Sequence, residues 1–337
     1  CSGFFAGSLF YLYQLTNDKS WLKQSKRFTE ALDSIQYLKW HHDVGFMIGS
    51  SYLNNYRLNP TKAYKKVIIQ TAKSLCTRFR KKAGVIQSWN VDRGWQSKRG
   101  WSCPVIIDNM MNLELLEWAA RHSDSTKFAK IASSHAKLTM KNHFRPDFSS
   151  YHVIGYNPET GAVEKKNTHQ GYAHESAWAR GQAWGLYGYT MMFRETGDSA
   201  YLNHAKGIAR FIMSHPNMPN DKVPYWDFNA PDIPNAKRDA SAAAIMASAF
   251  LELSSITKDT PEFSKQCQDI AEAQLRTLTS PEYLAEKGTN GGFILKHSVG
   301  NYPKGTEVDV PLTYADYYYV EALVRYKKLV LTIPTNK

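Results

Sequence analysis

Residues 195–211, ETGDSAYLNHAKGIARF, contain the pattern that decides the fold: a short polar turn ends at Asp198 and an amphipathic stretch follows at once. An aspartate in this position typically caps the first turn of a helix. The pattern returns as LTNDKSWLKQSKRF at 15–28, RHSDSTKFAKIASSHA at 121–136 and ITKDTPEFSKQCQDIAEAQL at 256–275. YRLNPTKAYKKVIIQTAKSL at 56–75 follows the same logic, with Pro60 where a first helical turn accepts it. Each turn therefore predicts a junction between two helices.

Apolar periodicity on both sides of these turns predicts about eleven helices. They cover residues 3–15, 19–37, 49–57, 61–80, 108–122, 125–142, 175–195, 199–214, 238–256, 261–279 and 313–330. Short turns make successive helices antiparallel neighbours, and a succession of such pairs forms a closed toroid or an open solenoid. Five hairpins and one unpaired helix suggest six pairs, with the missing helix expected ahead of Cys1.

The composition indicates a folded chain without a membrane span. Of the 337 residues, 43% are hydrophobic and 13% aromatic, which is enough to build a large core. No apolar run reaches the roughly 18 residues of a membrane-spanning helix, and residues 1–15 lack the basic flank and cleavage site of a signal peptide. The four cysteines have neither CxxC spacing nor closely spaced histidines, so we expect no metal site and no cofactor.

The formal net charge of +12 comes from short Lys and Arg clusters rather than from one long basic run. Such clusters are most simply solvated faces, and we expect no nucleic-acid partner. A diffuse positive field also attracts acidic polysaccharides, so the charge alone does not identify a ligand.

Long, chemically unusual segments separate the predicted hairpins. They are HHDVGF at 41–46, the tryptophan-rich segment 88–104, the histidine-rich segment 151–182, and residues 225–239 and 291–309. Each precedes the first helix of a pair. Because the helices alternate in direction, we expect all these segments to emerge at one rim of the array, and long ordered loops on one face usually carry function.

Asp43 and Asp108 are the candidate catalytic residues. Asp43 lies in a loop beside aromatic residues, and Asp108 ends the apolar run 105–107 and begins an apolar helix. Two carboxyls at one rim can hold one of the pair protonated near neutral pH, as a general acid requires. The helix N-terminus favours ionised Asp108 by up to about 1 kcal/mol and opposes this effect. The alternative is that each aspartate only caps the helix that follows it.

The densest polar and aromatic group in the chain supplies the candidate substrate-binding residues. A guanidinium group suits a carboxylate, and tryptophan faces suit the C–H surface of a sugar ring. Alternatively, the aromatic side chains fill the wide core of a toroid. The group comprises His152, Gln170, Trp178, Arg180 and Trp184.

Four motifs together resemble the unsaturated glucuronyl hydrolases of glycoside hydrolase family 88. They are HHDVGF at 41–46, IDNMMNLELL at 107–116, THQGYAHESAWARGQAWGLYGY at 168–189 and RDASAAAIMASAFLEL at 238–253, and the resemblance covers nearly the whole chain. It implies an all-α fold, an (α/α)6 barrel, formed by residues 1–337 as a single catalytic domain. The family's additional first helix would be the one expected ahead of Cys1.

The resemblance also implies the reaction. The substrate would be an acidic oligosaccharide with the 4,5-unsaturated uronic acid that a polysaccharide lyase leaves at the non-reducing end. Its enol-ether double bond is hydrated, with a proton delivered to C4 and water to C5. Asp108 then takes the role of general acid and base, and Asp43 that of the second essential carboxylate. His152, Gln170, Trp178 and Arg180 match substrate-site positions, with Arg180 and Gln170 assigned to the substrate carboxylate and hydroxyls.

The loop from His297 to Lys304 precedes the final helix, so we expect it at the same rim. Its polar side chains, Ser298 and Lys304 among them, can donate hydrogen bonds to the sugar next to the uronate, including any sulfate on it. The alternative is a solvated surface loop. A bacterial protein of the periplasm or the cytoplasm is expected from the family alone, and the oligomeric state stays open.

Two other functions compete with this interpretation. An unsaturated rhamnogalacturonyl hydrolase resembles the family in fold and in vinyl-ether hydration but acts on pectin fragments; the positive charge and the motif matches favour a glycosaminoglycan source. A non-catalytic saccharide-binding toroid would keep the aromatic residues without needing the acids. The presence of both Asp43 and Asp108 in their motifs argues against it.

Overall fold

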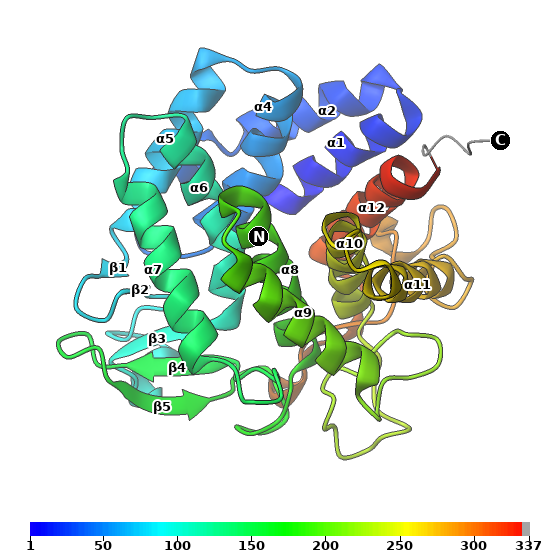
Figure 1. Ribbon diagram of the computed structural model, residues 1–337. Helices are drawn as coiled ribbons and strands as arrows, with labels where there is room; N and C mark the ends of the chain where they lie inside the picture. Colours follow the sequence, from blue (N-terminus) through cyan, green and yellow to red (C-terminus); the bar gives the residue numbers. More distant parts are fainter. Residues whose placement is uncertain (332–337) are drawn as a thin grey trace.

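Helical hairpins follow one another along the computed structural model, which describes residues 1–331 (Figure 1). The first hairpin joins α1 (Gly3–Thr16) to α2 (Lys19–Glu30), and the Asp18 carboxylate caps α2 by accepting a hydrogen bond from the Ser20 N–H at 2.8 Å. Asp198 caps α9 (Ser199–Ser214) in the same way. At these two turns the aspartate satisfies an otherwise unpaired N–H group, as the sequence suggests. The turns at Asp124 and Asp259 also lead into helices, at Lys127–Asn142 and Pro261–Leu278, but neither helix has a side-chain cap, so the capping expectation is wrong there.

All eleven predicted helical stretches are helical, with some differences at their ends. The stretch expected at 49–57 begins earlier, at Val44, and includes a π-helical turn at Gly49–Leu53. The remaining helices are α3 (Val44–Ile48), α4 (Asn54–Leu58), α5 (Lys62–Cys76), α6 (Leu113–Arg121), α7 (Lys127–Asn142), α8 (Ala179–Thr196), α9 (Ser199–Ser214), α10 (Ala240–Ile256), α11 (Pro261–Leu278) and α12 (Thr313–Tyr326).

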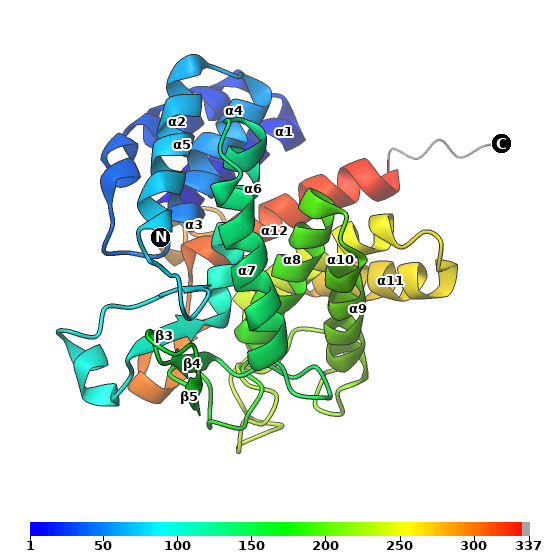
Figure 2. The same cartoon turned by 60° about the vertical axis from the view of Figure 1, so that its left-hand side comes forward.

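The helices form two concentric layers. The inner wall consists of α1, the continuous segment α3–α4, α6, α8, α10 and α12, each packed against the next, and α12 packs against α1 to close the ring (Figures 1 and 2). Helices α2, α5, α7, α9 and α11 lie outside. Six inner and five outer segments within residues 1–331 confirm the expected (α/α)6 toroid. The helix expected ahead of Cys1 stays a prediction.

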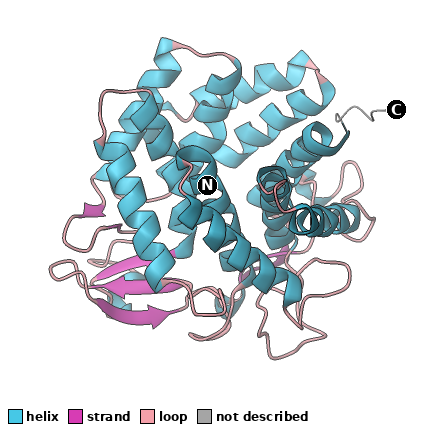
Figure 3. Cartoon of the chain, in the orientation of Figure 1, coloured by secondary structure: helices cyan, strands magenta, loops and turns pink. Residues whose placement is uncertain are grey.

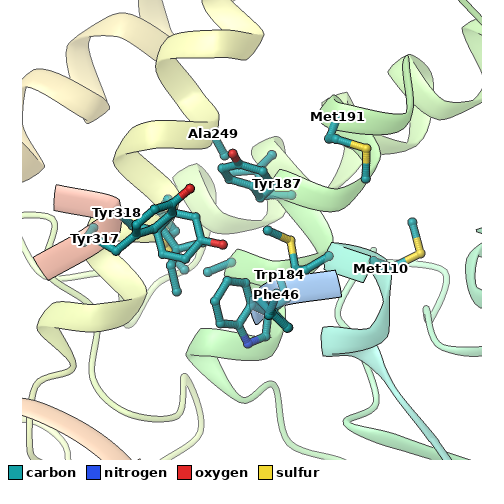
Figure 4. Close-up of a cluster of buried hydrophobic side chains, with 14 of the residues drawn as sticks. Phe46, Met110, Trp184, Tyr187, Met191, Ala249, Tyr317 and Tyr318 are labelled. Carbon is teal, nitrogen blue, oxygen red and sulfur yellow. The ribbon is translucent and has the colours of Figure 1, made fainter. Parts of the chain in front are cut away.

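Helix α10 is apolar or small on every side from Ala240 to Leu251, as a helix surrounded by other helices requires. Every residue of α10 from Ala240 to Ser254 is buried. Small residues also let the backbones approach: a Cβ on Gly188 of α8 would lie 2.6 Å from Met110 Cβ. Aromatic rings fill the centre, where Trp184 packs against Phe46 and Tyr318 (Figure 4).

Short antiparallel strands occupy most of the connections between hairpins, which the sequence analysis treated as loops. The strand Phe79–Arg80 also replaces the end of the helix expected at 61–80, because α5 ends at Cys76. The strands form three small sheets: β1 (Phe79–Arg80) with β2 (Val85–Ile86); β3 (Cys103–Ile106) with β4 (Val153–Tyr156) and β5 (Val163–Asn167); and β6 (Ser298–Asn301) with β7 (Thr306–Val310). Figure 3 shows β3, β4 and β5 below the helices, at one end of the molecule. None of the helices among the described residues has the length and hydrophobicity needed to cross a membrane.

A chain of ion pairs links the inner helices away from this end. Arg57, Arg194 and Arg325 lie in the last turns of their helices, and Glu114 lies in the first turn of α6. Glu114 of α6 pairs with Arg57 of α4 and with Arg194 of α8, the latter at 2.6 Å. Arg194 also pairs with Glu252 of α10, and Glu252 pairs with Arg325 of α12 at 2.6 Å. These ion pairs connect four different inner helices to the α3–α4 segment.

Hydrogen bonds complete the connection between the first and last helices. Glu321 of α12 accepts hydrogen bonds from Tyr11 of α1 at 2.7 Å and from Ser248 of α10 at 2.7 Å.

Burial acts to raise the pKa of Glu114, but Arg57 and Arg194 outweigh it and hold this pKa at about 2. The Glu114 carboxylate therefore stays charged over the physiological pH range and stabilises the fold through its pairs.

We expect the Arg325→Met substitution to lower the free energy of unfolding by about 3 kcal/mol, because it leaves the carboxylates of Glu252 and Glu321 without this cation. Lys265→Met is the control, since Lys265 pairs with Asp269 on the exposed face of α11 and such pairs contribute at most about 1 kcal/mol. Urea denaturation measures both. Equal losses in the two variants would show that the buried ion pairs do not stabilise the toroid.

Candidate active site

The inner segments begin at the end of the toroid that carries the strands. Asp43 immediately precedes α3, and Asp108 lies in the 3-10 turn Ile107–Asn112 that leads into α6. Trp178 precedes α8 and Asp239 precedes α10. The expectation that the unusual segments share one rim is confirmed by this arrangement.

Neither candidate catalytic aspartate caps a helix with its side chain. Asp43 stands at the N-cap position of α3 but accepts no hydrogen bond from the backbone of that helix, and the side chain of Asp108 caps nothing. Asp239 shows the contrast: its carboxylate accepts a hydrogen bond from the Ser241 N–H at 3.0 Å and caps α10. The capping alternative therefore does not account for Asp43 or Asp108.

The carboxyl of Asp108 is held in an apolar and largely dehydrated place. Its side chain is 15% exposed, and Oδ2 is buried without a hydrogen-bond partner. Burial is the largest effect on the pKa of Asp108; together with the charge of Asp43, and against the lowering effect of Arg180, it raises this pKa from 3.8 to about 7. A carboxyl with this pKa is present in both protonation states near neutral pH, which suits a residue that donates and then accepts a proton.

Asp43 lies between two histidines and the first residue of the chain. His42 Nδ1 is 3.2 Å from Asp43 Oδ1 and 3.2 Å from Asn109 Oδ1. Burial lowers the pKa of His42 to about 4, so its ring is neutral and donates through Nδ1–H. The Cys1 thiol contacts Oδ2 of Asp43 at 3.4 Å. Asp43 thus faces neutral donors, and its negative charge acts on Asp108.

Asparagines in the second motif fix the two aspartates relative to each other. Asn109, which contacts His42, also accepts a hydrogen bond from Asn112 at 3.1 Å, and Asn112 in turn accepts one from the Phe46 N–H at 3.0 Å. Gly45 is required at this contact, because a Cβ there would lie 2.4 Å from Asn112 Oδ1. Sequence reasoning missed Asn109 and Asn112, although both lie in the IDNMMN motif.

His152 reaches Asp108 through strand pairing. Ile106 of β3 pairs with Val153 of β4, and the Ile107 N–H donates to the carbonyl of His152 at 3.0 Å. The His152 Nδ1 accepts backbone N–H groups of His169 and Gln170, both at 3.1 Å. The ring proton therefore sits on Nε2, which is buried without a partner 3.9 Å from Asp108 Oδ2. Burial keeps the pKa of His152 well below its usual value, so it is a neutral donor.

Trp178 and Trp184, the two candidate substrate-binding tryptophans, both lie at the beginning of α8. Trp178 packs on the His152 ring at 4.5 Å between centroids, and the Arg180 guanidinium lies 4.4 Å from the Trp178 ring centroid. Trp184 is deeper, one turn after Arg180, and its indole N–H is buried without a hydrogen-bond partner in the described structure. Both side chains are at least 96% buried, so they shape the bottom of the site rather than an open platform.

Arg180 differs from the sequence-based expectation. Its guanidinium is 3% exposed, pairs with Asp239 at 3.0 Å and donates to the backbone carbonyls of Val299 and Gly300. The expected direct bond to a substrate carboxylate is not supported, because these partners already occupy the planar fork. Arg180 instead joins α8, α10 and the loop that contains β6.

The remaining candidate substrate-binding residues, Ser298, Gln170 and Lys304, lie in or next to the same loop, and the expectation for Ser298 is wrong. Ser298 is fully buried, so its side chain is not available to a saccharide. Gln170 donates to the Gly300 carbonyl at 2.9 Å and is partly exposed. Lys304 is exposed, with its Nζ 4.3 Å from the centroid of the Trp95 ring. Lys304 thus lies at the surface where the sequence analysis expected it.

An aromatic wall beside these residues escaped the sequence analysis. Trp95 stacks on His169 at 3.9 Å between centroids, and Trp89 lies edge-on to Trp95 and to His169. Asn301 contacts the His169 ring at 3.3 Å. The tryptophan-rich segment 88–104 was the available signal, but nothing in the sequence states which of its rings face the site. Within residues 1–331, no three His, Cys, Asp or Glu side chains are grouped to hold a metal ion.

Known proteins resemble this chain in sequence and in overall fold. The chain is 45% identical over 331 residues to an unsaturated glucuronyl hydrolase of Formosa agariphila, covering 98% of this chain and 80% of that protein. It is 33% identical to an unsaturated chondroitin disaccharide hydrolase of Streptococcus pneumoniae, covering 97% and 81%. A solved structure of an unsaturated glucuronyl hydrolase specific for heparin is 52% identical, with a TM-score of 0.92 over 97% of this chain and 85% of that one.

A helical toroid with a protonatable carboxyl at one mouth, together with these relatives, defines the protein as a glycoside hydrolase. More narrowly, the chain belongs to Glycosyl Hydrolase Family 88, whose sequence profile matches residues 1–328. The resemblance found in the four sequence motifs is thereby confirmed.

The raised pKa of Asp108 predicts how stability depends on pH. The folded protein binds the Asp108 proton more tightly than the unfolded chain, so this group contributes stability below about pH 4 that is lost as the pH rises to about 7. Asn at this position does not ionise. We expect the melting temperature of Asp108→Asn, relative to the native protein, to rise between about pH 4 and about pH 7 and then to level off.

Thermal unfolding across this pH range measures the effect. Asp232→Asn, which alters an exposed carboxyl, is the control and should differ from the native protein by a constant amount. A constant difference for Asp108→Asn as well would mean that the pKa of Asp108 is not raised in the folded protein.

Proposed function

We propose that this enzyme is an unsaturated glucuronyl hydrolase that removes the 4,5-unsaturated uronic acid from the non-reducing end of lyase-generated glycosaminoglycan fragments. The observation that carries the proposal is Asp108, a carboxyl whose pKa burial raises to about 7, in a chain whose relatives are named for this activity. Its neutral form supplies a proton, and its ionised form accepts one.

In the proposed reaction Asp108 donates its proton to C4 of the C4=C5 vinyl ether, and positive charge develops on C5 and the ring oxygen. Water adds to C5, and the Asp108 carboxylate accepts the proton that this water releases. The hemiketal formed at C5 then rearranges and releases the rest of the saccharide. Because the anomeric carbon is not attacked, the carboxylate separation that distinguishes retaining from inverting glycosidases does not apply.

The neighbours of Asp108 adjust this proton transfer. The negative charge of Asp43 favours protonated Asp108 before the reaction and stabilises positive charge as it develops. The His152 Nε2–H is fully buried, lies 3.9 Å from the same carboxyl and has no hydrogen-bond partner of its own, so it acts on Asp108 rather than on the substrate. Arg180 acts as a positioning residue. Its buried charge lowers the pKa of Asp108, and its hydrogen bonds to the carbonyls of Val299 and Gly300 hold β6 in place.

The sugar next to the uronate is proposed to lie along the aromatic wall. Trp95 and His169 provide a stacked aromatic surface, and the ammonium of Lys304 stands over Trp95. An exposed cation beside an aromatic face suits a sulfated sugar. One relative is described as specific for heparin and another as a chondroitin disaccharide hydrolase, which makes both kinds of fragment relevant.

Unsaturated disaccharides from heparin, chondroitin and rhamnogalacturonan test the function directly, because hydration abolishes the ultraviolet absorbance of the conjugated double bond. We expect turnover of glycosaminoglycan disaccharides by the native protein. Asp108→Asn should reduce kcat at least a hundredfold while binding stays within about tenfold. Faster turnover of the rhamnogalacturonan fragment would reassign the enzyme to pectin, and binding without turnover of any fragment would indicate a non-catalytic saccharide-binding protein.

Asp43→Asn tests the coupling between the two carboxyls. Removing the charge of Asp43 should lower the pKa of Asp108, so the high-pH limb of the kcat/KM profile should move to lower pH. Asp92→Asn, on an exposed part of the same rim, is the control for a general change of charge. An unmoved limb in the Asp43 variant would contradict coupling even if activity falls.

Lys304→Ala tests the proposed contact with sulfate. We expect kcat/KM to fall about fivefold or more on sulfated disaccharides and much less on unsulfated ones, with the difference shrinking as salt screens the charge. Lys98→Ala, which removes another exposed lysine of this rim, should not discriminate between the substrates. Identical losses on both substrates at low salt would remove sulfate recognition from Lys304.

A further inference from the structure

A second feature that suits an acidic ligand lies outside the active site, on the outer wall. Four lysines of α5 line one groove at helical spacing: Lys62, Lys65, Lys66 and Lys73. The other side of the groove is formed by the 3-10 turn Asp33–Tyr37, including the exposed ring of Tyr37. The groove has a volume of about 450 Å³ and is open to solvent.

The lysines of this groove carry uncompensated charge. In the described structure, none of the four ammonium groups has a hydrogen bond or a carboxylate oxygen within 4.0 Å. Lysines three and four residues apart on a helix repel one another, so this arrangement costs stability unless an anion binds there. The two nearby carboxylates, Asp33 and Glu30, accept hydrogen bonds from the neutral side chains of Gln36 and Tyr64 and form no ion pair with these lysines.

The groove is connected to the active site by a short segment. Residues 37–43 run from Tyr37 to Asp43, at most about 21 Å when extended. Tyr37 and Trp40 on this segment are 63% and 56% exposed, which is unusual for large aromatic side chains. Beyond Trp40 a second open pocket, of about 470 Å³, is lined by His41, Trp89 and other residues of the rim.

We propose that the groove between α5 and residues 33–37 is a binding site for an acidic polysaccharide, separate from the catalytic site. The lysines would contact sulfates or carboxylates along the polymer, and Tyr37 would pack on the apolar face of a sugar. A groove lined by cations and an aromatic ring also suits single-stranded nucleic acid. The glycan is favoured because the neighbouring site is proposed to act on acidic saccharides, so the identity of the ligand rests on the proposed function.

The test compares two variants of equal charge. One replaces the four groove lysines by Gln, and the control replaces four exposed lysines on α7: Lys127, Lys130, Lys137 and Lys141. The probe is a heparin octasaccharide with a saturated non-reducing end, which is not a substrate for hydration. We expect its Kd at low salt to rise about tenfold or more in the groove variant and less than about twofold in the control, with Tyr37→Ala weakening binding about threefold.

The outcomes separate the groove from the catalytic function. Turnover of unsaturated disaccharides should be unchanged in the groove variant, because a disaccharide bound at Asp108 does not reach α5. Equal weakening in both lysine variants would overturn the proposal in favour of a nonspecific charge effect. Tighter, groove-dependent binding of a single-stranded oligonucleotide of matched charge would also overturn it. Octasaccharide binding is read without catalysis, so loss of the proposed hydrolase activity would not imitate either result.

Discussion

Alternation of helix direction places the N-terminal ends of all six inner segments at one mouth of the toroid and their C-terminal ends at the other. The first mouth therefore gathers unpaired backbone N–H groups and positive ends of helix dipoles, which favour anions. The second gathers carbonyl ends, and there Arg57, Arg194 and Arg325 stand among carboxylates. The site and the ion pairs are thus two consequences of one arrangement of the chain.

Asp108 shows how opposing electrostatic effects are resolved at the first mouth. A helix N-terminus and the cation of Arg180 both favour its ionised form, whereas dehydration favours the neutral form. Burial is the largest of these effects and the charge of Asp43 adds to it, so the pKa rises to about 7. An acid kept fully ionised by its helix would bind a proton too weakly to deliver it to carbon at neutral pH.

Much of the fold was predictable because hairpin caps and apolar periodicity are local signals; Asp18 and Asp198 cap helices as their sequence context suggests. The proximity of Asp43 and Asp108 followed from the shared rim. The short strands were not predictable, since pairs such as β3 with β4 depend on residues about fifty positions apart. The partners of Arg180 and the burial of Ser298 depend on tertiary contacts between α8, α10 and β6, which leave no periodic trace in the sequence.

The contact between Tyr11 of α1 and Glu321 of α12 joins residues 310 positions apart. A ribosome makes the other inner helices of the described structure before α12 emerges. Until then Glu252 has no Arg325 with which to form its ion pair, and the side of α1 that packs against α12 is uncovered. Closure of the ring therefore depends on α12, which covers apolar surface of both α1 and α10 in the folded protein.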